Sequence, residues 1–394
     1  MHAPPLARRL NGLQSSAIRD LLTITARADI ISLAGGLPDP DLIPRDRIRA
    51  AADAALVDPS SVQYTETSGW AGLRDVLAVR ESKRLGRAIA ASEIVVTHGS
   101  QQALSLLAQV LLDPGALVIV EDPAYTGALQ VFRTAEAQIE AVPLDDDGMS
   151  VDALSALLES GVRPTVVHTV SNFHNPGSVS LSTQRRVRLA ELADRYGFWV
   201  IEDDPYGEIW FHNAPPLPVA AHSDRVIRLS SASKILAPAL RTGWLQAPEH
   251  VCRAVELIKQ GVDLCGSALT QRIAATLLAD DDWLESHLGD VRSAYRERSE
   301  TLSRAVQKEF GDAVASTDVD GGMFCWLDFR DGTDTETLLA AALDEGVAFV
   351  PGSAFAVGND YKNAMRLCFT TSEGSVLEEA VARLACAHGA RLRS

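Results

Sequence analysis

The chain has few cysteines and no long uninterrupted hydrophobic run. Its five cysteines are widely spaced and form no C-x-x-C pair: Cys252, Cys265, Cys325, Cys368 and Cys386. This odd number without pairing argues against a disulfide framework or a zinc site and fits a reducing compartment. No apolar stretch approaches the length of a membrane span, and the first residues lack the apolar core of a signal peptide. We therefore expect a soluble, cytoplasmic protein.

Basic side chains are also in the minority. The 394 residues include 36 lysines and arginines against 52 aspartates and glutamates, which gives a formal net charge of −16. Nucleic acids and anionic membranes are poor partners for such a surface. The length and the 46% hydrophobic content fit a globular protein of two domains. An acidic protein that binds a small anion must hold local basic groups for it.

What the chain does contain is an alternation of short apolar runs and helical patterns, beginning near residue 70. The apolar runs are 94–97, 116–120, 165–169, 198–201 and 226–229. Short, fully apolar strands separated by helices are typical of a mostly parallel sheet that helices cover on both faces. The sequence therefore predicts an α/β fold.

The pattern changes towards the C-terminus. Two long helical stretches (248–279 and 285–309) are followed by short strands at 322–328, 347–350 and 365–369, with helices between and after them. A further short helix is expected over 16–26. We predict an N-terminal arm and part of a small domain over 1–45, a large domain over 46–290 and a small C-terminal α/β domain over 291–394.

Polar residues follow the predicted strands at their carboxyl ends. They lie in the segments 99–101, 122–125, 171–175, 203–206 and 230–234. Ligands of parallel sheets bind at this edge. We therefore expect these segments to line one site.

Lys234 is the candidate nucleophile of that site. It follows Ser231 and Ser233, and Arg241 comes shortly after. An amine can form an imine with a carbonyl group, and two hydroxyls and a guanidinium suit phosphate oxygens. The alternative for a lone lysine is an exposed loop position.

Asp203 is the candidate partner of a pyridine nitrogen. It ends an apolar strand, and Tyr206 follows within reach of a ring hydroxyl. A carboxylate beside that nitrogen keeps it protonated, so the ring can accept electrons. Glu202 and Asp204 compete for this assignment, and an acidic strand end can also be a helix cap. Together, the amine, the carboxylate and the phosphate donors predict a pyridoxal 5'-phosphate site.

Four further residues carry weaker signals. Ser100 and Gln101 begin a helix and can cradle a phosphate, although Ser100 can also be a plain cap. Tyr125 can stack on a ring or lie in the core. Asn175 precedes a proline, which is typical of a turn, and can also donate to a ring hydroxyl.

Arg366 lies within an apolar strand. Such an arginine is costly to bury unless it meets an anion, and its planar fork matches a substrate α-carboxylate. The alternative is an edge-strand arginine whose head group reaches water.

In order and spacing, these residues resemble the class I/II aminotransferases, which are pyridoxal phosphate enzymes of fold type I, and in particular the branch of 2-aminoadipate and kynurenine aminotransferases. The resemblance extends from Ala17-Ile-Arg and Ala34-Gly-Gly-Leu-Pro to Met365-Arg366. It implies a mostly parallel seven-stranded sheet sandwiched by helices, with a smaller C-terminal α/β domain.

The resemblance also implies a role for each residue. Lys234 would form the Schiff base and shuttle a proton, Asp203 would meet the ring nitrogen, and Tyr206 and Asn175 would meet the ring hydroxyl. Tyr125 would lie over the ring. The phosphate would be held by Ser100, Gln101, Ser231, Ser233 and Arg241.

On the substrate side, Arg366 would bind the carboxylate, with Asn175 and Gly36 beside it. Arg19 matches a mobile arginine that in relatives meets the far end of a dicarboxylic substrate. Tyr64 matches a tyrosine that reaches the phosphate from a partner subunit, so the resemblance implies a homodimer with shared sites.

One motif departs from the family. The usual Asn-Pro-Thr-Gly is here Asn175-Pro176-Gly177-Ser178. The asparagine is kept, which favours intact cofactor binding, but the neighbouring loop and substrate pocket are open to change.

We therefore predict an aminotransferase that moves an amino group between an aromatic, branched-chain or 2-aminoadipate-like L-amino acid and a 2-oxo acid such as 2-oxoglutarate. One alternative is the same cofactor with decarboxylation, elimination or amine oxidation as the outcome. The other is a transcription-regulator-type domain, which the acidic charge and the absence of a visible basic recognition helix disfavour.

Overall fold

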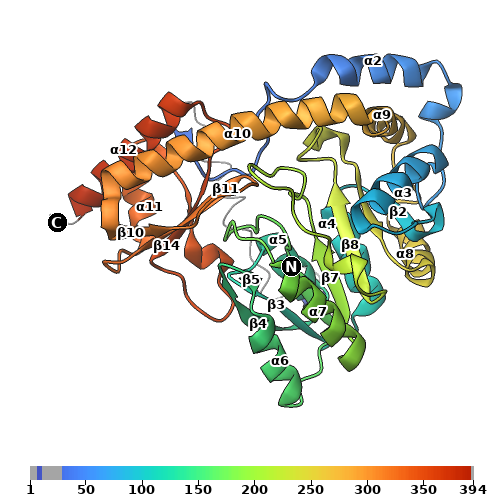
Figure 1. Ribbon diagram of the computed structural model, residues 1–394, viewed down its shortest axis with the longest axis horizontal. Coiled ribbons are helices and arrows are strands. Elements are labelled where there is room, and N and C mark those ends of the chain that lie inside the picture. Colours follow the sequence, from blue (N-terminus) through green and yellow to red (C-terminus); the bar gives the residue numbers. More distant parts are fainter. Residues whose placement is uncertain (1–6, 11–28, 392–394) are drawn as a thin grey trace, which may run out of the picture.

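The computed structural model describes residues 7–10 and 29–391, and in them the largest sheet has eight strands (Figure 1). In spatial order these are β2 (Ile94–Thr97), β9 (Gly243–Gln246), β8 (Val226–Ser231), β7 (Trp199–Asp203), β6 (Val166–Thr169), β3 (Leu117–Asp122), β4 (Gln138–Asp145) and β5 (Gly148–Met149). Neighbours from β8 to β4 are parallel, whereas β2, β9 and β5 join antiparallel. The predicted mostly parallel seven-stranded sheet is confirmed, with the two-residue β5 added at one edge.

Helices cover both faces of this sheet because successive side chains of a strand point to opposite sides. Val95 of β2 packs into a core with α4, α5 and α8, while Val96 packs into the core that contains α3, α6, α7 and α9. These helices are α3 (Ala71–Leu85), α4 (Ser100–Leu111), α5 (Thr126–Thr134), α6 (Val151–Glu159), α7 (Thr183–Tyr196), α8 (Glu249–Val262) and α9 (Ala268–Leu278). The apolar strands are therefore buried on both faces, as the α/β prediction requires.

A second, four-stranded antiparallel sheet lies beside the first. Its strands, in spatial order, are β10 (Val314–Ser316), β11 (Phe324–Phe329), β14 (Ala364–Cys368) and β13 (Val350–Pro351). The helices α10 (Asp281–Phe310), α11 (Thr335–Asp344) and α12 (Gly374–Arg391) pack with it, and α2 (Arg45–Leu56) packs on α9. The short strands β1 (Ile31–Ser32) and β12 (Val347–Ala348) form a separate pair. Figure 1 shows α10 running across the upper part of the molecule, from α9 to the small sheet, with α2 above its right-hand end.

Some predicted elements differ in detail. The single helical stretch over 248–279 is two helices, because the chain breaks before Ser267, whose hydroxyl accepts from Thr270 N and caps α9. The next helix begins earlier than residue 285, where Asp280 caps α10. The predicted boundary at residue 290 falls inside α10, and the division into domains stays a prediction. The helix expected over 16–26 lies outside the described residues.

The arrangement of the strands positions the site. The parallel strands β3, β6, β7 and β8 all end at one edge of the large sheet, and the small sheet brings β11 and β14 towards that edge. Among the helices of the described ranges, none combines the length and the apolar character needed to cross a membrane.

Candidate active site

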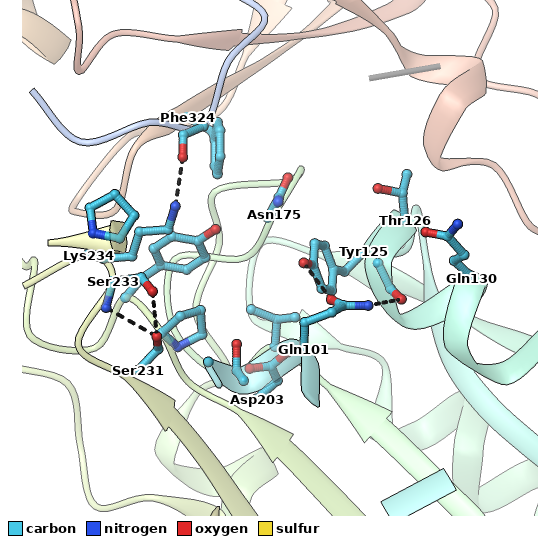
Figure 2. Close-up of a pocket in the computed structure, with 18 of the residues that line it drawn as sticks. Gln101, Tyr125, Thr126, Gln130, Asn175, Asp203, Ser231, Ser233, Lys234 and Phe324 are labelled. Atoms are coloured by element: carbon cyan, nitrogen blue, oxygen red, sulfur yellow. Dashed lines mark hydrogen bonds between the residues drawn. The ribbon is translucent and has the colours of Figure 1, made fainter. Parts of the chain in front are cut away.

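A cavity of about 450 Å³ lies at the carboxyl edge of the large sheet, against the small sheet. Figure 2 shows its two walls, with Asp203 below and Phe324 above in the view. The predicted residues that line it are Gly36, Ser100, Gln101, Tyr125, Asn175, Asp203, Tyr206, Ser231, Ser233, Lys234, Arg241 and Arg366. Segments far apart in the sequence therefore meet in one place.

Lys234 follows β8 and points into the cavity, where its Nζ donates to the backbone oxygen of Gly36 at 2.7 Å. Burial lowers the pKa of Lys234 to about 8, and the charges of Arg366 and Arg241 act in the same direction. An amine in this environment is neutral at a lower pH than an exposed lysine, as a nucleophile must be.

Three consecutive acids, Glu202, Asp203 and Asp204, lie at the end of β7, and their side chains have different surroundings. Glu202 accepts from the backbone N–H groups of Val219 and Ala220, and Asp204 pairs with Arg228 at 2.7 Å. Asp203 alone of the three lines the cavity, and its buried Oδ1 has no partner among the described residues. A buried carboxylate oxygen without a partner marks the place of a missing donor. The choice between the three acids therefore falls on Asp203.

His168 lies behind Asp203. Its Nε2 is 3.8 Å from Oδ2 of Asp203, and both side chains are buried. His168 lies in β6, the strand next to β7, so the contact between His168 and Asp203 follows only from the pairing of these two strands.

Two tyrosines keep their protons in the cavity. Burial raises the pKa of Tyr125 to about 12, and the charge of Asp203 adds to this effect. Burial likewise raises the pKa of Tyr206, an effect that the side chain of Asn175 opposes only in part. The hydroxyl of Tyr125 donates to Oε1 of Gln101 at 3.2 Å, while the amide of Gln101 donates to Gly127 O at 3.0 Å. Gln101 thus fixes Tyr125 at the start of α5.

One end of the cavity collects hydroxyls and a guanidinium. Ser231 Oγ donates to Ser233 Oγ at 2.9 Å, and Arg241 Nη2 donates to His98 O at 2.7 Å. The turn that precedes α4 is packed too tightly for side chains: a Cβ on Gly243 would lie 2.7 Å from Ser100 N. A Cβ on Gly99 would meet Arg241 Nη2 at the same distance. Close backbone, hydroxyls and a helix N-terminus suit a phosphate group.

The opposite end is built around Arg366, which is buried in β14. Its Nη1 donates to Asn175 Oδ1 at 2.7 Å and its Nη2 to Ala34 O at 2.6 Å. Its guanidinium carbon lies 4.2 Å from the ring centroid of Phe324. Burial lowers the pKa of Arg366 to about 10, so it is charged at neutral pH. Within the described residues it forms no ion pair and its Nε is unpartnered, which leaves its charge available to an anion.

His174 stabilises the turn that carries Asn175. The Nδ1 of His174 accepts from Gly177 N at 3.1 Å, and its Nε2 lies 3.0 Å from Oε2 of the buried Glu121. This network assigns the proton to Nε2. His174 is therefore structural. Gly177 and Ser178, which replace the usual Thr-Gly of the family motif, belong to the same buried turn.

Tyr64 does not line the cavity of its own chain. It follows the 3-10 helix η2 (Pro59–Val62) and is 77% exposed. Arg19 lies outside the described residues, so its predicted role stays a prediction.

Gly99 and Pro205 also line the cavity, within two of the segments that were expected there. Some other lining residues were not predicted from the sequence: Thr126, Gly127, Gln130, Val170, Pro238 and Phe324. Thr126, Gly127 and Gln130 begin α5 next to Tyr125, and that proximity is a signal the sequence offered. Phe324 gave none, because it approaches from the small sheet.

The geometry defines a class of enzyme site. A buried amine with a lowered pKa lies in one cavity with a phosphate-type end, a carboxylate whose Oδ1 has no partner among the described residues, and an arginine that forms no ion pair with them. This arrangement can bind a substrate carboxylate while the lysine reacts with a carbonyl group.

Comparisons with known proteins agree with this class. Residues 28–384 match the family of class I and II aminotransferases. The aromatic-amino-acid aminotransferase 1 of Thermococcus litoralis is 39% identical over 382 residues, covering 95% of this chain and 91% of that protein. The 2-aminoadipate transaminase of Thermus thermophilus is 36% identical over 379 residues, covering 94% and 93% of the two chains.

A solved structure agrees as well. The kynurenine aminotransferase of Pyrococcus horikoshii, in complex with PMP, with KYN as substrates and KYA as products, superimposes with a TM-score of 0.93. It is 38% identical, and the match covers 99% of this chain and 98% of that chain.

The chain belongs to the class I and II aminotransferases. The predicted fold type I and the predicted pyridoxal-phosphate-dependent transamination are confirmed at the level of this family. The roles of the individual site residues in this chain remain proposals.

Proposed function

We propose that the cavity holds pyridoxal 5'-phosphate between Asp203 and Lys234, and that the enzyme uses it to move an amino group from an L-amino acid to a 2-oxo acid. The observation that carries this proposal is Asp203, which lines the same cavity as Lys234 and whose buried Oδ1 has no hydrogen-bond donor among the described residues. When bound, this cofactor supplies an aldehyde that condenses with amines and a ring that withdraws electrons from the substrate.

The residues of the chain fit the rest of this cofactor. Asp203 would keep a proton on the ring nitrogen, Tyr125 would cover the ring, and Tyr206 and Asn175 would meet its hydroxyl. The phosphate would be held at the end formed by Ser100, Gln101, Ser231, Ser233 and Arg241, where the glycine backbone leaves space for it.

Lys234 moves the proton of the reaction. Because burial lowers its pKa to about 8, its Nζ can take up a proton from a substrate carbon near neutral pH and return it. Gly36 O accepts from this amine and marks its resting position. Arg366 holds the substrate carboxylate, and Asn175 orients Arg366.

We propose an aromatic, branched-chain or 2-aminoadipate-like amino donor and 2-oxoglutarate as an acceptor. The names of the related enzymes support the aromatic and 2-aminoadipate-like part of this range. The cavity supports it through apolar lining side chains: Phe324, whose ring lies against Arg366, and Val170.

The test separates transamination from the other outcomes of the same cofactor. The purified enzyme is loaded with the cofactor and mixed with one amino acid and no acceptor. We expect one equivalent of 2-oxo acid and of aminated cofactor per site, without release of ammonia or carbon dioxide. Lys234→Ala should lose turnover and change the visible absorbance of the bound cofactor. Release of ammonia or carbon dioxide in repeated turnovers would contradict the proposal.

We also propose a homodimer in which Tyr64 completes the site of the partner. Tyr64 is exposed together with Val57 and Val62, at 77%, 83% and 70%, and it lies outside the cavity of its own chain. Exposed apolar side chains of this kind mark an interaction surface.

Mixing two inactive variants tests this arrangement. In a hybrid of Lys234→Ala and Tyr64→Ala subunits, one site carries both changes and the other is intact if the tyrosine crosses to the partner. We therefore expect activity to return after the variants are unfolded and refolded together. If the mixture is no more active than the separate variants, Tyr64 does not serve the partner site.

A further inference from the structure

Ser178 occupies the position at which the family motif Asn-Pro-Thr-Gly has glycine, and its backbone conformation shows why glycine is usual there. Its φ is +62°, in the left-handed region that side chains other than glycine disfavour. Ser178 is nevertheless buried, and its N–H donates to His174 O at 2.6 Å, which closes the turn. A strained non-glycine residue beside an active site calls for a compensating contact.

That contact is made by the hydroxyl. Ser178 Oγ donates to the backbone oxygen of Phe324 at 2.6 Å, across from the large sheet to the first residue of β11. Cys368 of β14 lies opposite Phe324 in the strand pairing, but its N–H donates to Leu33 O and not to the Phe324 carbonyl. Among the described residues, the hydroxyl of Ser178 thus provides the donor for this buried carbonyl of the small sheet.

The ring of Phe324 in turn touches the substrate end of the cavity. Its centroid lies 4.2 Å from the guanidinium carbon of Arg366 and 6.0 Å from the ring of Tyr206. A Cβ on Gly36 would lie 2.9 Å from its Cζ. A shift of the Phe324 backbone would therefore move the surface on which Arg366 rests.

We propose that Ser178 is a positioning residue that fixes Phe324, and through it Arg366, for the substrate carboxylate. This inference rests on the proposed role of Arg366 in carboxylate binding. It assigns the departure from the usual motif a function in substrate affinity, not in cofactor binding, because Ser178 contacts the small sheet and not the phosphate end.

Two variants separate the hydroxyl from the backbone strain. Ser178→Gly removes both, whereas Ser178→Ala removes the hydroxyl and keeps the strained φ. If the hydroxyl positions Arg366, both variants should weaken the binding of an amino acid and of an unreactive aromatic carboxylate roughly three- to tenfold, the equivalent of one hydrogen bond. Their thermal stabilities should differ, with the alanine variant the less stable.

The readouts are the KM of the cofactor-loaded enzyme, the Kd of 3-phenylpropionate by calorimetry and the Kd of the cofactor. We expect the first two to rise together and the third to stay within twofold. Ser155→Ala is the matched control, because it removes another buried serine hydroxyl in α6, away from the cavity. It should leave all three constants unchanged.

A double variant tests the route through the aromatic ring. Phe324→Leu keeps the backbone carbonyl but removes the ring beneath Arg366, so adding Ser178→Ala to it should raise the Kd of 3-phenylpropionate no further. Additive effects would overturn the proposed route. Carboxylate binding within twofold of wild type in both Ser178 variants would overturn the inference while leaving the transamination proposal intact. A wild-type enzyme that takes up no cofactor, or that binds no carboxylate, would overturn both.

Discussion

Asn175 orients Arg366: its Oδ1 accepts from Arg366 Nη1 at 2.7 Å. The same side chain lowers the pKa of the Tyr206 hydroxyl against the larger effect of burial, so one amide acts both at the end of the cavity proposed for the substrate carboxylate and at the proposed position of the ring hydroxyl. His174 and Glu121 hold the turn on which this amide is placed. The orientation of Arg366 is thus set by three separate parts of the chain: Asn175, Phe324 of the small sheet, and Ala34, whose backbone oxygen accepts from Arg366 Nη2 at 2.6 Å.

Asn175→Ala should raise the KM for the amino acid about 10- to 100-fold, because a hydrogen bond to a charged group contributes about 1.5–3 kcal/mol. Steady-state kinetics of the cofactor-loaded enzyme check this. Asn363→Ala serves as control, since Asn363 donates to Phe329 O in the small sheet and lies outside the cavity. Equal KM values for the two variants would contradict the role of Asn175.

Asp203→Asn should weaken cofactor binding about 10- to 100-fold, because it removes the charge from the partnerless Oδ1 while keeping the shape of the side chain. The measurement is a fluorescence titration of the cofactor-free protein with pyridoxal phosphate. Asp203→Glu keeps the charge and should recover part of the loss. Unchanged affinity in the asparagine variant would show that the carboxylate faces no charged partner.

Much of this site could be predicted from the sequence because parallel strands end at the same edge of a sheet. Asp203 ends β7, and Ser100 and Lys234 each lie three residues after the end of a strand, so their proximity follows from the fold alone. The alternation of side chains along an extended chain also favours Asp203 among the three neighbouring acids, because Glu202 and Asp204 point elsewhere and have partners there.

The parts that could not be predicted involve contacts between the two sheets. Phe324 and Ser178 meet only because β11 approaches the turn after β6, and nothing local in either segment indicates this.

The strand β4 was missed for a different reason: its residues Gln138, Glu140 and Asp145 are polar and largely exposed, so it lacks an apolar run. A strand of this kind is recognised only by its pairing with β3.

The reactivity of Lys234 should rise with pH around a midpoint of about 8 in the cofactor-free enzyme. Its pKa is lowered from 10.5 by burial, so the neutral, nucleophilic amine is present above pH 8 and is lost as the pH falls below it. Labelling with an amine-reactive acetylating reagent, followed by mass spectrometry of the peptides, gives the midpoint for each lysine. Lys308 is the internal reference, because hydrogen bonding to Glu309 raises its pKa and it should react only at higher pH. Identical midpoints for both lysines would show that Lys234 is not desolvated.

Gly243→Ala should damage the proposed phosphate end through the backbone. The added Cβ would lie 2.5–2.7 Å from the backbone of Gly99 and Ser100, and backbone atoms cannot move aside as a flexible side chain can. The turn before α4 must then shift, so we expect at least a roughly tenfold loss of affinity for pyridoxal phosphate together with a lower melting temperature.

Gly261→Ala is the matched control for this change. A Cβ on Gly261 meets nothing within 4 Å, and Gly261 lies in α8, where alanine favours the helix by about 0.5–1 kcal/mol. This variant should keep its cofactor affinity and melt at a slightly higher temperature. If Gly243→Ala binds the cofactor as tightly as Gly261→Ala does, the contact between Gly243 and the Gly99–Ser100 turn does not shape the phosphate end, and the assignment of Ser100 to the phosphate loses its structural support.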